Sequence, residues 1–270
     1  MKKRPYIGKY GILESLYPDI YFGRQPYFLE IQLGYELRAF VENGREELLD
    51  DLRYLRNMMD IKYGIPVPPI HIRDNLVIAA EEYTISLYGR EIEKEKIRIG
   101  YEMCIARPED EISFTNTDNY PVKIIEPLWG LPAFLILDDD LKLMLKMDSL
   151  GFFRRSPYGI LKTHILKCIL DNRTKILNQT LVNQIINKVR STNPDVINDI
   201  FVLHEFPISS MKKILNHLLA DQYSIRDMNT ILEAIADNIN QSQEPEFLVE
   251  KVKEQIPGPL NKWAWYYWEL

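Results

Sequence analysis

Apolar residues recur at helical spacing in the last third of the chain, most clearly between positions 207 and 235. Two apolar stripes are separated there by the break Asp221–Tyr223. Because steps of three and four residues bring side chains onto one face of a helix, the pattern predicts two helices joined by a short turn. Such a helical hairpin must bury both apolar faces against other elements. The stripes comprise Met211, Ile214, Leu215, Leu218 and Leu219, then Ile225, Met228, Ile231, Leu232 and Ile235.

The sequence also indicates where helices begin and end. Ser224 and Asp227 precede the second stripe of the hairpin, where their side chains can accept hydrogen bonds from the free amides of a helix start. Gly64 follows a helical apolar pattern over 45–63 and suits a helix end. Ser156 followed by Pro157 suits a helix start. Further helices are predicted over 181–189, 196–203 and 247–252.

Alternating apolar residues predict strands in the first half of the chain. Leu29, Ile31 and Leu33 alternate as in a strand with one buried face. Prolines at 66, 68 and 69 force an extended approach to a strand at 70–72. Further short strands are predicted over 83–88, 101–105 and 132–137, the last leading into a helix that begins at Asp138.

These elements predict a mixed α/β and α+β fold with several subdomains. We expect residues 26–80 and 128–155 to form a small α/β subdomain that is interrupted by an inserted β-rich module over 81–127. Residues 156–239 are expected to form an all-helical subdomain. Residues 1–25 are expected to be a linker-like segment that lies on the body of the protein or on a neighbouring subunit. Pro108–Pro121, rich in Asp, Asn and Thr, is expected to be an exposed loop.

Length, charge and cysteine usage bound the class of protein. A chain of 270 residues exceeds the usual size of a single domain. The 39 acidic and 33 basic side chains are interspersed and leave a net charge of −6, which argues against the concentrated basic face of a nucleic-acid binder. Cys104 and Cys168 lack C-x-x-C spacing and suit a reducing compartment. Because no apolar run reaches the length of a membrane span and the first residues lack a signal-peptide core, we expect a soluble, cytoplasmic chain.

Two groups of side chains have residue types that metals use, but both have a simpler structural explanation. His164 and Cys168 are four positions apart on one helix face, yet a zinc site requires three or four ligands, and no other histidine has a complementary spacing. Asp138–Asp140 precede an apolar helix and are expected to cap it rather than to hold magnesium. We therefore predict no metal and no cofactor.

Sequence motifs of nucleotide binding and nucleophilic catalysis are absent. The chain contains no G-x-S-x-G, no G-x-x-x-x-G-K-[ST] and no G-x-G-x-x-G pattern. The helical hairpin carries neither a nucleophile nor a set of metal ligands. We therefore expect a protein that is not an enzyme and that acts through contacts with other proteins.

Five segments, in the same order along the chain, resemble the cytosolic domain of the FlhA-type export gate proteins of flagellar and virulence type III secretion systems. The most characteristic is Ser224–Met228 with Ile231–Glu233 after it. The others are Leu29–Tyr35, Val67–Asn75, Glu126–Ala133 and Leu161–His164. The resemblance therefore extends over most of the chain.

The resemblance implies a cytosolic platform that docks chaperone–substrate complexes and forms a ring of subunits, nonameric in the family, at the cytoplasmic face of the inner membrane. The implied partners are export chaperones, secretion substrates and other proteins of the export apparatus. Family members carry a membrane half before this domain and a fourth subdomain at its end. By this comparison, residues 240–270 are a remnant of the fourth subdomain with an aromatic tail at Trp263–Trp268, which is expected to pack into a groove or to dock on a partner.

The resemblance also implies candidate site residues. In the family, chaperone complexes dock in the cleft between the α/β subdomain and its insert, and the matching positions here are Arg73, Asp74, Asn75 and Val77. The alternative is that Asp74 only fixes the amides of its own turn. For Arg226 and Asp227, the alternatives are scaffolding of the hairpin and contact with a neighbouring subunit.

A second interpretation of the whole chain stays open. The lack of a membrane segment and the altered tail also suit a stand-alone, truncated relative that acts as a soluble adaptor or regulator of the secretion system. The isolated chain is expected to be monomeric, because the membrane half normally concentrates the subunits.

Overall fold

A computed structural model of the chain describes residues 27–43, 45–106, 121–126 and 130–260. The chain divides into two compact units. The first, here called the sheet unit, comprises residues 1–53 and 68–170. The second, here called the helical unit, comprises residues 54–67 and 171–270. The predicted linker-like segment, the Pro108–Pro121 loop except Pro121, and the Trp263–Trp268 tail lie outside the described residues.

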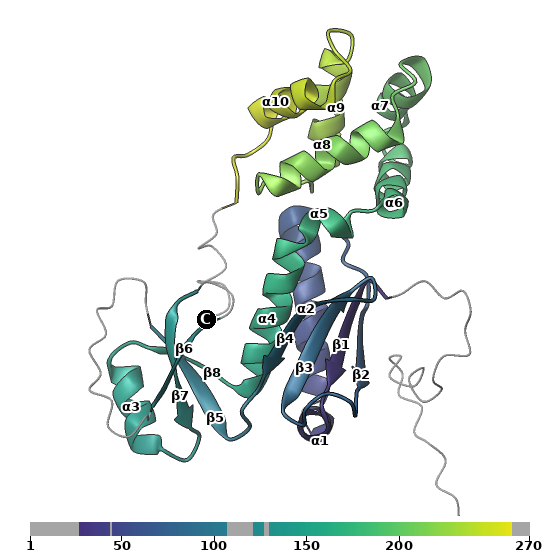
Figure 1. Cartoon of the computed structure of the whole chain (residues 1–270). Helices are drawn as coiled ribbons and strands as arrows, with labels where there is room; N and C mark the ends of the chain where they lie inside the picture. The colour runs from purple at the N-terminus through teal and green to yellow at the C-terminus, as the bar shows by residue number, and fades with distance from the viewer. Residues whose placement is uncertain (1–26, 44, 107–120, 127–129, 261–270) are drawn as a thin grey trace, which may run out of the picture. The chain divides into compact units, whose positions relative to one another are not determined.

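The first sheet of the sheet unit has the strand order β2-β1-β3-β4 (Figure 1). The central strand β1 (Leu29–Leu33) pairs in parallel with β2 (Ile70–Asp74) and antiparallel with β3 (Glu82–Leu87), which in turn pairs antiparallel with β4 (Arg90–Lys96). The parallel crossover from β1 to β2 contains the helices α1 (Tyr35–Asn43) and α2 (Arg45–Tyr63). Leu29, Ile31 and Leu33 are buried, so the predicted strand with one buried face is confirmed.

The turn between β3 and β4 has two central residues with positive φ, Tyr88 (φ 49°) and Gly89 (φ 77°). Positive φ at both positions is typical of the type I′ turn, whose twist matches that of the flanking strands. Two ladder pairs, Leu87 with Arg90 and Ser86 with Glu91, flank this turn. The register then shifts between Ser86 and Ile85, which marks a β-bulge in the hairpin.

The second sheet is antiparallel throughout and has the strand order β6-β7-β5-β8. Its strands are β5 (Tyr101–Ile105), β6 (Val122–Ile125), β7 (Pro132–Leu137) and β8 (Phe153–Arg155). The helix α3 (Leu141–Ser149) begins after Asp140, whose side chain accepts a hydrogen bond from the amide of Leu143, as the capping interpretation of the aspartate run predicts. A buried cluster joins this helix to the sheet and comprises Cys104, Ala106, Phe134, Ile136, Met144, Met147 and Phe152.

The strand pairing corrects the expected extent of the inserted module. Strands β3 and β4 were expected in a β-rich insert over 81–127, but β3 pairs with β1 in the first sheet. Strand β7 was expected in the α/β subdomain, but it pairs with β5 and β6 in the second sheet. The physical reason is the match of buried positions: Ile31 faces Ile85 and Leu33 faces Tyr83 across the ladder, and local sequence patterns do not reveal such distant partners. The other subdomain limits stay predictions.

The sheet unit also contains α4 (Pro157–Asp171), whose start is as predicted. The Ser156 hydroxyl accepts a hydrogen bond from the amide of Gly159, and Pro157 is the first helical residue. His164 and Cys168 both lie on the buried side of this helix. The Tyr83 hydroxyl on β3 lies 2.6 Å from Nδ1 of His164, which ties the helix to the first sheet.

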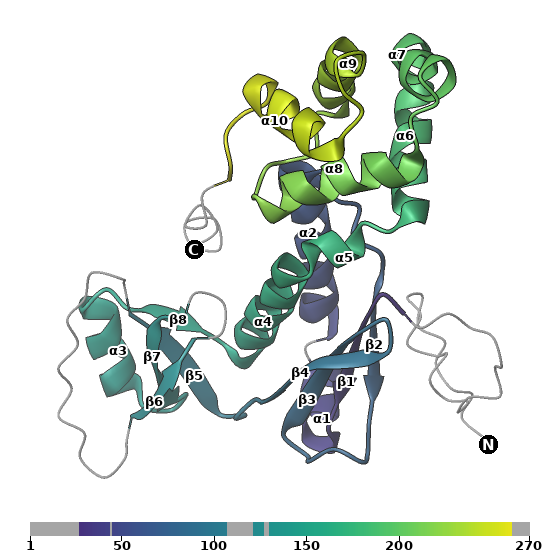
Figure 2. The ribbon, with the colours of Figure 1, turned by 45° about the horizontal axis from the view of Figure 1, so that its top comes forward.

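The helical unit confirms the hairpin and the helices predicted around it (Figures 1 and 2). The two hairpin helices are α8 (Ile208–Ala220) and α9 (Met228–Asn238), and α10 (Pro245–Gln255) packs against both. All ten apolar residues of the two predicted stripes are buried. The remaining elements are α5 (Arg173–Ile176), α6 (Gln179–Arg190), α7 (Pro194–Asn198) and the π-helical turn η2 (Asp199–Leu203). Within the described residues, no helix combines the length and apolar character that crossing a bilayer requires.

Candidate functional site

The first predicted site lies in the sheet unit, at the end of β2 and in the turn that follows it. Its polar side chains contact residues of their own unit. Arg73 Nε donates a hydrogen bond to Glu30 Oε1 (3.1 Å), and Asn75 Nδ2 donates one to Gln32 Oε1 (2.6 Å). Gln32 Nε2 also donates to Glu30 Oε1 (2.6 Å), so the four side chains form a continuous polar row across β1 and β2.

Asp74 and Asn75 have different roles in this turn. Asp74 accepts a hydrogen bond from Nη1 of Arg38 on α1 (3.2 Å), and both side chains of this ion pair are substantially exposed. Asn75 Oδ1 accepts a hydrogen bond from the amide of Val77 (2.9 Å), while the amide of Asn75 donates to the carbonyl of Leu33 (2.8 Å). The structural role that the sequence offered for Asp74, fixing the amides of the turn, therefore belongs to Asn75.

The turn presents two apolar side chains to solvent. Leu76 is 74% exposed and Val77 is 93% exposed. We call this pair the apolar tip. Asn75 closes the backbone of this turn and ties it to β1. A constrained backbone lowers the entropy lost when a partner covers the pair. Val77 is a candidate from the sequence, whereas Leu76 was missed, although an apolar pair inside a turn is itself an unusual signal.

The second predicted site, Arg226 and Asp227, lies in the helical unit between α8 and α9. Arg226 Nη1 donates a hydrogen bond to the carbonyl of Ile61 at the end of α2 (3.1 Å). Asp227 caps α9, because its carboxylate accepts hydrogen bonds from the amide (3.2 Å) and the hydroxyl (2.8 Å) of Thr230. The amide of Ile225 donates to the carbonyl of Tyr63 (2.8 Å). These contacts support the scaffolding alternative and bind the hairpin loop to the end of α2.

Gly64 allows this close approach. It has a φ of +73°, and a Cβ atom at this position would overlap the backbone of Arg226. The amide of Gly64 donates to the carbonyl of Asp60 (2.9 Å), which ends α2 with a left-handed residue. The sequence predicts Gly64 as a helix end but not as the point of contact with a loop about 160 residues later, at Arg226.

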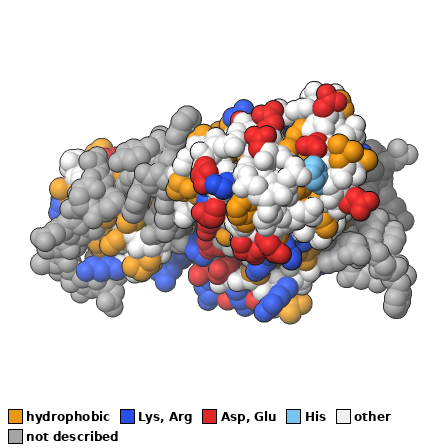
Figure 3. All heavy atoms as spheres, turned by 90° about the horizontal axis from the view of Figure 1, so that it is seen from above, with side chains coloured by type: hydrophobic (Ala, Val, Ile, Leu, Met, Phe, Trp, Pro, Cys, Tyr) orange, Lys and Arg blue, Asp and Glu red, His pale blue; other side chains and the backbone are white. Residues whose placement is uncertain are grey.

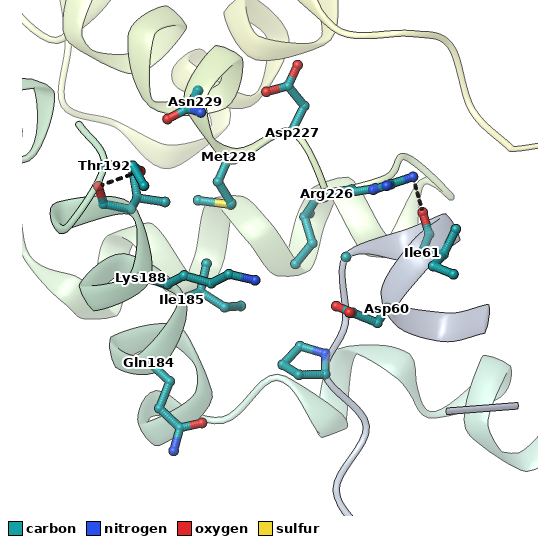
Figure 4. Close-up of a pocket in the computed structure, with 14 residues that line it drawn as sticks. Asp60, Ile61, Gln184, Ile185, Lys188, Thr192, Arg226, Asp227, Met228 and Asn229 are labelled. Atoms are coloured by element: carbon teal, nitrogen blue, oxygen red, sulfur yellow. Dashed lines mark hydrogen bonds between the residues drawn. The ribbon is translucent and has the colours of Figure 1, made fainter. Parts of the chain in front are cut away.

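A pocket of about 560 Å³ lies beside this contact, and all of its lining residues belong to the helical unit. We call it the hairpin pocket. Figure 4 shows Lys188 of α6 and Asp60 of α2 at its sides, with Arg226 and Met228 above them. Ile61, Ile185 and Val189 add apolar surface. The described residues that line it include neither histidine nor cysteine nor serine, so the pocket suits binding of a mixed apolar and polar group better than covalent chemistry.

The surface of the helical unit has charges of both signs. Figure 3 shows acidic side chains with basic ones between and beside them on the face that it presents. Lys253, for example, lies between Asp221 (2.9 Å) and Glu250 (2.7 Å). The Lys253 ammonium group donates hydrogen bonds to the carboxylates of Glu250 and Asp221, and these bonds raise its pKa. Such mixed charge favours contacts with proteins over contacts with a polyanion.

The predicted residues belong to two different units. Arg73, Asp74, Asn75 and Val77 belong to the sheet unit, and Arg226 and Asp227 belong to the helical unit. In each group, the charged side chains form hydrogen bonds within their own unit. Exposed apolar side chains lie beside them, namely the apolar tip in the sheet unit and Ile61 in the helical unit. The sequence could name the charged residues from the resemblance, but exposure of Leu76 and the lining of the hairpin pocket depend on the fold.

Comparisons with known proteins agree with this architecture. The FHIPEP family model matches residues 23–262. The flagellar biosynthesis protein FlhA of Treponema pallidum (strain Nichols) is 29% identical over 232 residues, which are 84% of this chain and 31% of that protein. FlhA of Bacillus subtilis (strain 168) is 24% identical over 235 residues, which are 86% of this chain and 33% of that protein. The chain thus spans about a third of the length of these relatives.

Solved structures show the same fold at lower sequence identity. The Chlamydia pneumoniae CdsV protein has a TM-score of 0.73 at 21% identity, over 88% of this chain and 68% of that one. CdsV in its complex with CdsO also has a TM-score of 0.73, at 20% identity, over 86% of this chain and 70% of that one. The nonameric EPEC SctV-C has a TM-score of 0.64 at 17% identity, over 87% of this chain and 66% of that one.

The family match over residues 23–262, together with the FlhA relatives, decides the family of this chain. The chain belongs to the FHIPEP family and spans about a third of the length of the flagellar biosynthesis proteins FlhA that it resembles.

Proposed function

We propose that this chain is the cytosolic platform of a type III protein export gate, where it docks complexes of export chaperones with their secretion substrates. The apolar tip is the observation that carries this proposal. Leu76 and Val77 are 74% and 93% exposed on a turn that is fixed by Asn75. Exposed apolar side chains on a rigid support are typical of surfaces that another protein covers.

In this proposal, the charged residues around the tip position it. Arg73 and Asn75 hold the turn against β1 through Glu30 and Gln32, and Asp74 holds it against α1 through Arg38. A partner then gains most from covering Leu76 and Val77 and less from the ion pairs, because exposed ion pairs contribute little free energy. The residues proposed to touch the partner are therefore Leu76 and Val77, and the polar residues predicted from the sequence hold them in place.

The test measures the affinity of the chain for purified chaperone–substrate complexes of the same secretion system. We expect Val77→Asp to weaken binding about tenfold or more, because burial of an apolar side chain of this size contributes about 1.5–3 kcal/mol. Asp74→Ala is expected to weaken binding only severalfold, because Asp74 acts through the position of the turn. Val202→Asp is the matched control. Val202 is also an exposed valine, with 62% of its surface accessible, but it belongs to the helical unit.

Unchanged affinity in Val77→Asp, together with a native circular dichroism spectrum, would remove the apolar tip from the docking surface. An equal loss in Val202→Asp would show that the effect comes from added charge rather than from this site.

We further propose that the chain forms a ring with other copies and lies at the cytoplasmic face of the inner membrane. The EPEC SctV-C structure is nonameric, and the chain shares its fold. The complex of CdsV with CdsO supports contacts with other proteins of the export apparatus as well. We propose no enzymatic step for this chain.

A further inference from the structure

A group of side chains of the types that bind metals lies at the contact between β4 and α4 in the sheet unit (Figure 1). Sequence spacing left His164 and Cys168 without a third metal ligand. The fold supplies one, because Glu93 of β4 lies against the same face of α4. One donor atom from each of Glu93, His164 and Cys168 lies within 4.8 Å of the others.

We propose that Glu93, His164 and Cys168 bind a single divalent cation of the zinc type. The donors are a carboxylate oxygen, an imidazole nitrogen and a thiolate, and this combination of oxygen, nitrogen and sulfur suits zinc better than magnesium or calcium. A carboxylate and a thiolate together carry two negative charges, which match the charge of the ion. Three protein ligands leave the fourth tetrahedral position to water.

One pair of donor atoms already has the separation of a bound site, and all three donor atoms lie within 4.8 Å of one another. The gap between His164 Nε2 and Glu93 Oε2 is 3.8 Å. Ligand atoms in a tetrahedral zinc site are separated by about 3.3–3.8 Å, given metal–ligand distances of about 2.0–2.3 Å. The donor atoms must move closer together to hold an ion, and the Glu93 side chain has the freedom to do so. It is 37% exposed at the edge of the sheet, whereas the side chain of His164 is buried. Its exposed position also gives the ion a path from solvent.

The β-bulge explains why Glu93 faces the helix. Glu93 pairs with Ile85, and the register shifts between Ile85 and Ser86, so that Ile92 has no partner in the ladder. Glu93 therefore lies on the face of the sheet that carries the buried Tyr83 and Ile85. Bulges often redirect a side chain toward a site, and here the side chain is a carboxylate aimed at a buried histidine.

Tyr83 orients the imidazole in the way that metal sites require. Its hydroxyl lies 2.6 Å from His164 Nδ1, on the side of the ring opposite to Nε2. A histidine ligand usually donates its other N–H to such a partner, which fixes the tautomer and leaves the second nitrogen to the metal. Lys167 lies 3.5 Å from Glu93 Oε1, so one carboxylate oxygen is paired with a cation and the other faces His164.

The test adds Co²⁺, and separately Zn²⁺, to the full chain after treatment with a chelator. We expect Co²⁺ to produce the visible d–d bands of a tetrahedral site together with a thiolate charge-transfer band, at a stoichiometry of one ion per chain. Zn²⁺ should abolish both bands by displacement and should raise the unfolding temperature. Binding should release protons and strengthen with rising pH, because the thiol must lose its proton.

Variants distinguish this site from adventitious binding. Cys168→Ser should remove the charge-transfer band, and Glu93→Gln, which preserves shape at a half-exposed position, should weaken Co²⁺ binding at least tenfold. Tyr83→Phe removes only the outer partner and should weaken binding by about tenfold. Lys167→Met removes a nearby positive charge and should tighten binding severalfold.

Cys104→Ser is the matched control. Cys104 is the other buried thiol of the chain, and burial, assisted by Glu102, raises its pKa to about 12. We expect this variant to keep both Co²⁺ bands. Absence of the charge-transfer band in the wild-type chain, or Co²⁺ binding that is unchanged in both Cys168→Ser and Glu93→Gln, would overturn the proposal.

Discussion

The left-handed conformation of Gly64 joins two segments of the helical unit. It ends α2 with a φ of +73°, and its missing Cβ leaves room for the backbone of Arg226. We predict that Gly64→Ala lowers the free energy of unfolding by about 1–2 kcal/mol from the left-handed conformation alone, and by more because the hairpin loop must move. Urea denaturation measures the change.

Gly100→Ala is the control for this substitution. Gly100 has a similar φ of +82°, but a Cβ atom there would meet nothing within 4 Å. Its loss of stability should therefore contain only the conformational part. Equal losses in both variants would show that the contact between Gly64 and Arg226 does not constrain the loop.

The hydrogen bonds of His204 should make the stability of the protein depend on pH. Its Nδ1 lies 2.9 Å from the carbonyl of Asp199 and its Nε2 lies 2.9 Å from Asn240 Oδ1. The hydrogen bond to the Asp199 carbonyl, followed by that to Asn240, raises the pKa of His204. Because the folded-state pKa lies above the unfolded value of about 6.5, the protonated ring stabilises the fold fully below that pH. This contribution is lost as the pH rises through the folded-state pKa.

We therefore expect the urea midpoint of the wild-type chain to fall between about pH 6 and pH 8 by more than that of His204→Gln. The difference between the two chains at each pH isolates the histidine. His217→Gln, which removes a histidine from α8, is the control. A wild-type curve parallel to that of His204→Gln would contradict the prediction.

At the scale of elements, the start of α9 depends on a single carboxylate. Asp227 accepts hydrogen bonds from the amide and the hydroxyl of Thr230, and the sequence predicts this cap. We expect Asp227→Ala to lower the free energy of unfolding by about 0.5–2 kcal/mol, and Asp227→Asn to restore most of the loss, because asparagine caps equally well. Thermal unfolding followed by circular dichroism provides the measurement.

A result in which Asp227→Ala keeps full stability but loses contact with other copies would instead favour the subunit-contact alternative. The same reasoning applies to Arg226, whose hydrogen bond to the Ile61 carbonyl joins the hairpin loop to α2.

At the scale of the whole molecule, association should depend on how densely copies are held together. The net charge of −6 makes free copies repel one another at low salt. We expect the free chain to sediment as a monomer at micromolar concentration, and copies attached to lipid vesicles through an amino-terminal tag to cross-link into larger assemblies. Added salt should increase the cross-linked fraction.

Cross-linking that is equally poor on vesicles and in solution would favour the stand-alone adaptor over the ring-forming platform. Vesicles bearing the tagged chain at a tenfold lower density are the internal control, because they preserve the lipid surface and remove only the crowding.

Local patterns were sufficient for much of this protein. The two stripes of the hairpin, the cap at Asp227, the helix end at Gly64 and the alternation of β1 all follow from spacing and from the hydrogen-bonding capacity of single side chains. These features depend on interactions between residues a few positions apart, which a linear pattern contains.

The pairing of distant segments was decided by tertiary structure. Strand β3 joined β1 rather than an inserted module, Glu93 came to face His164, and the carbonyl of Ile61 came to face Arg226. In each case the partners are far apart in the chain, and the contact depends on which apolar faces are buried together and on a bulge or a glycine that lets backbones approach. Hydrophobic patterns specify that a face must be covered, but only the folded chain selects what covers it.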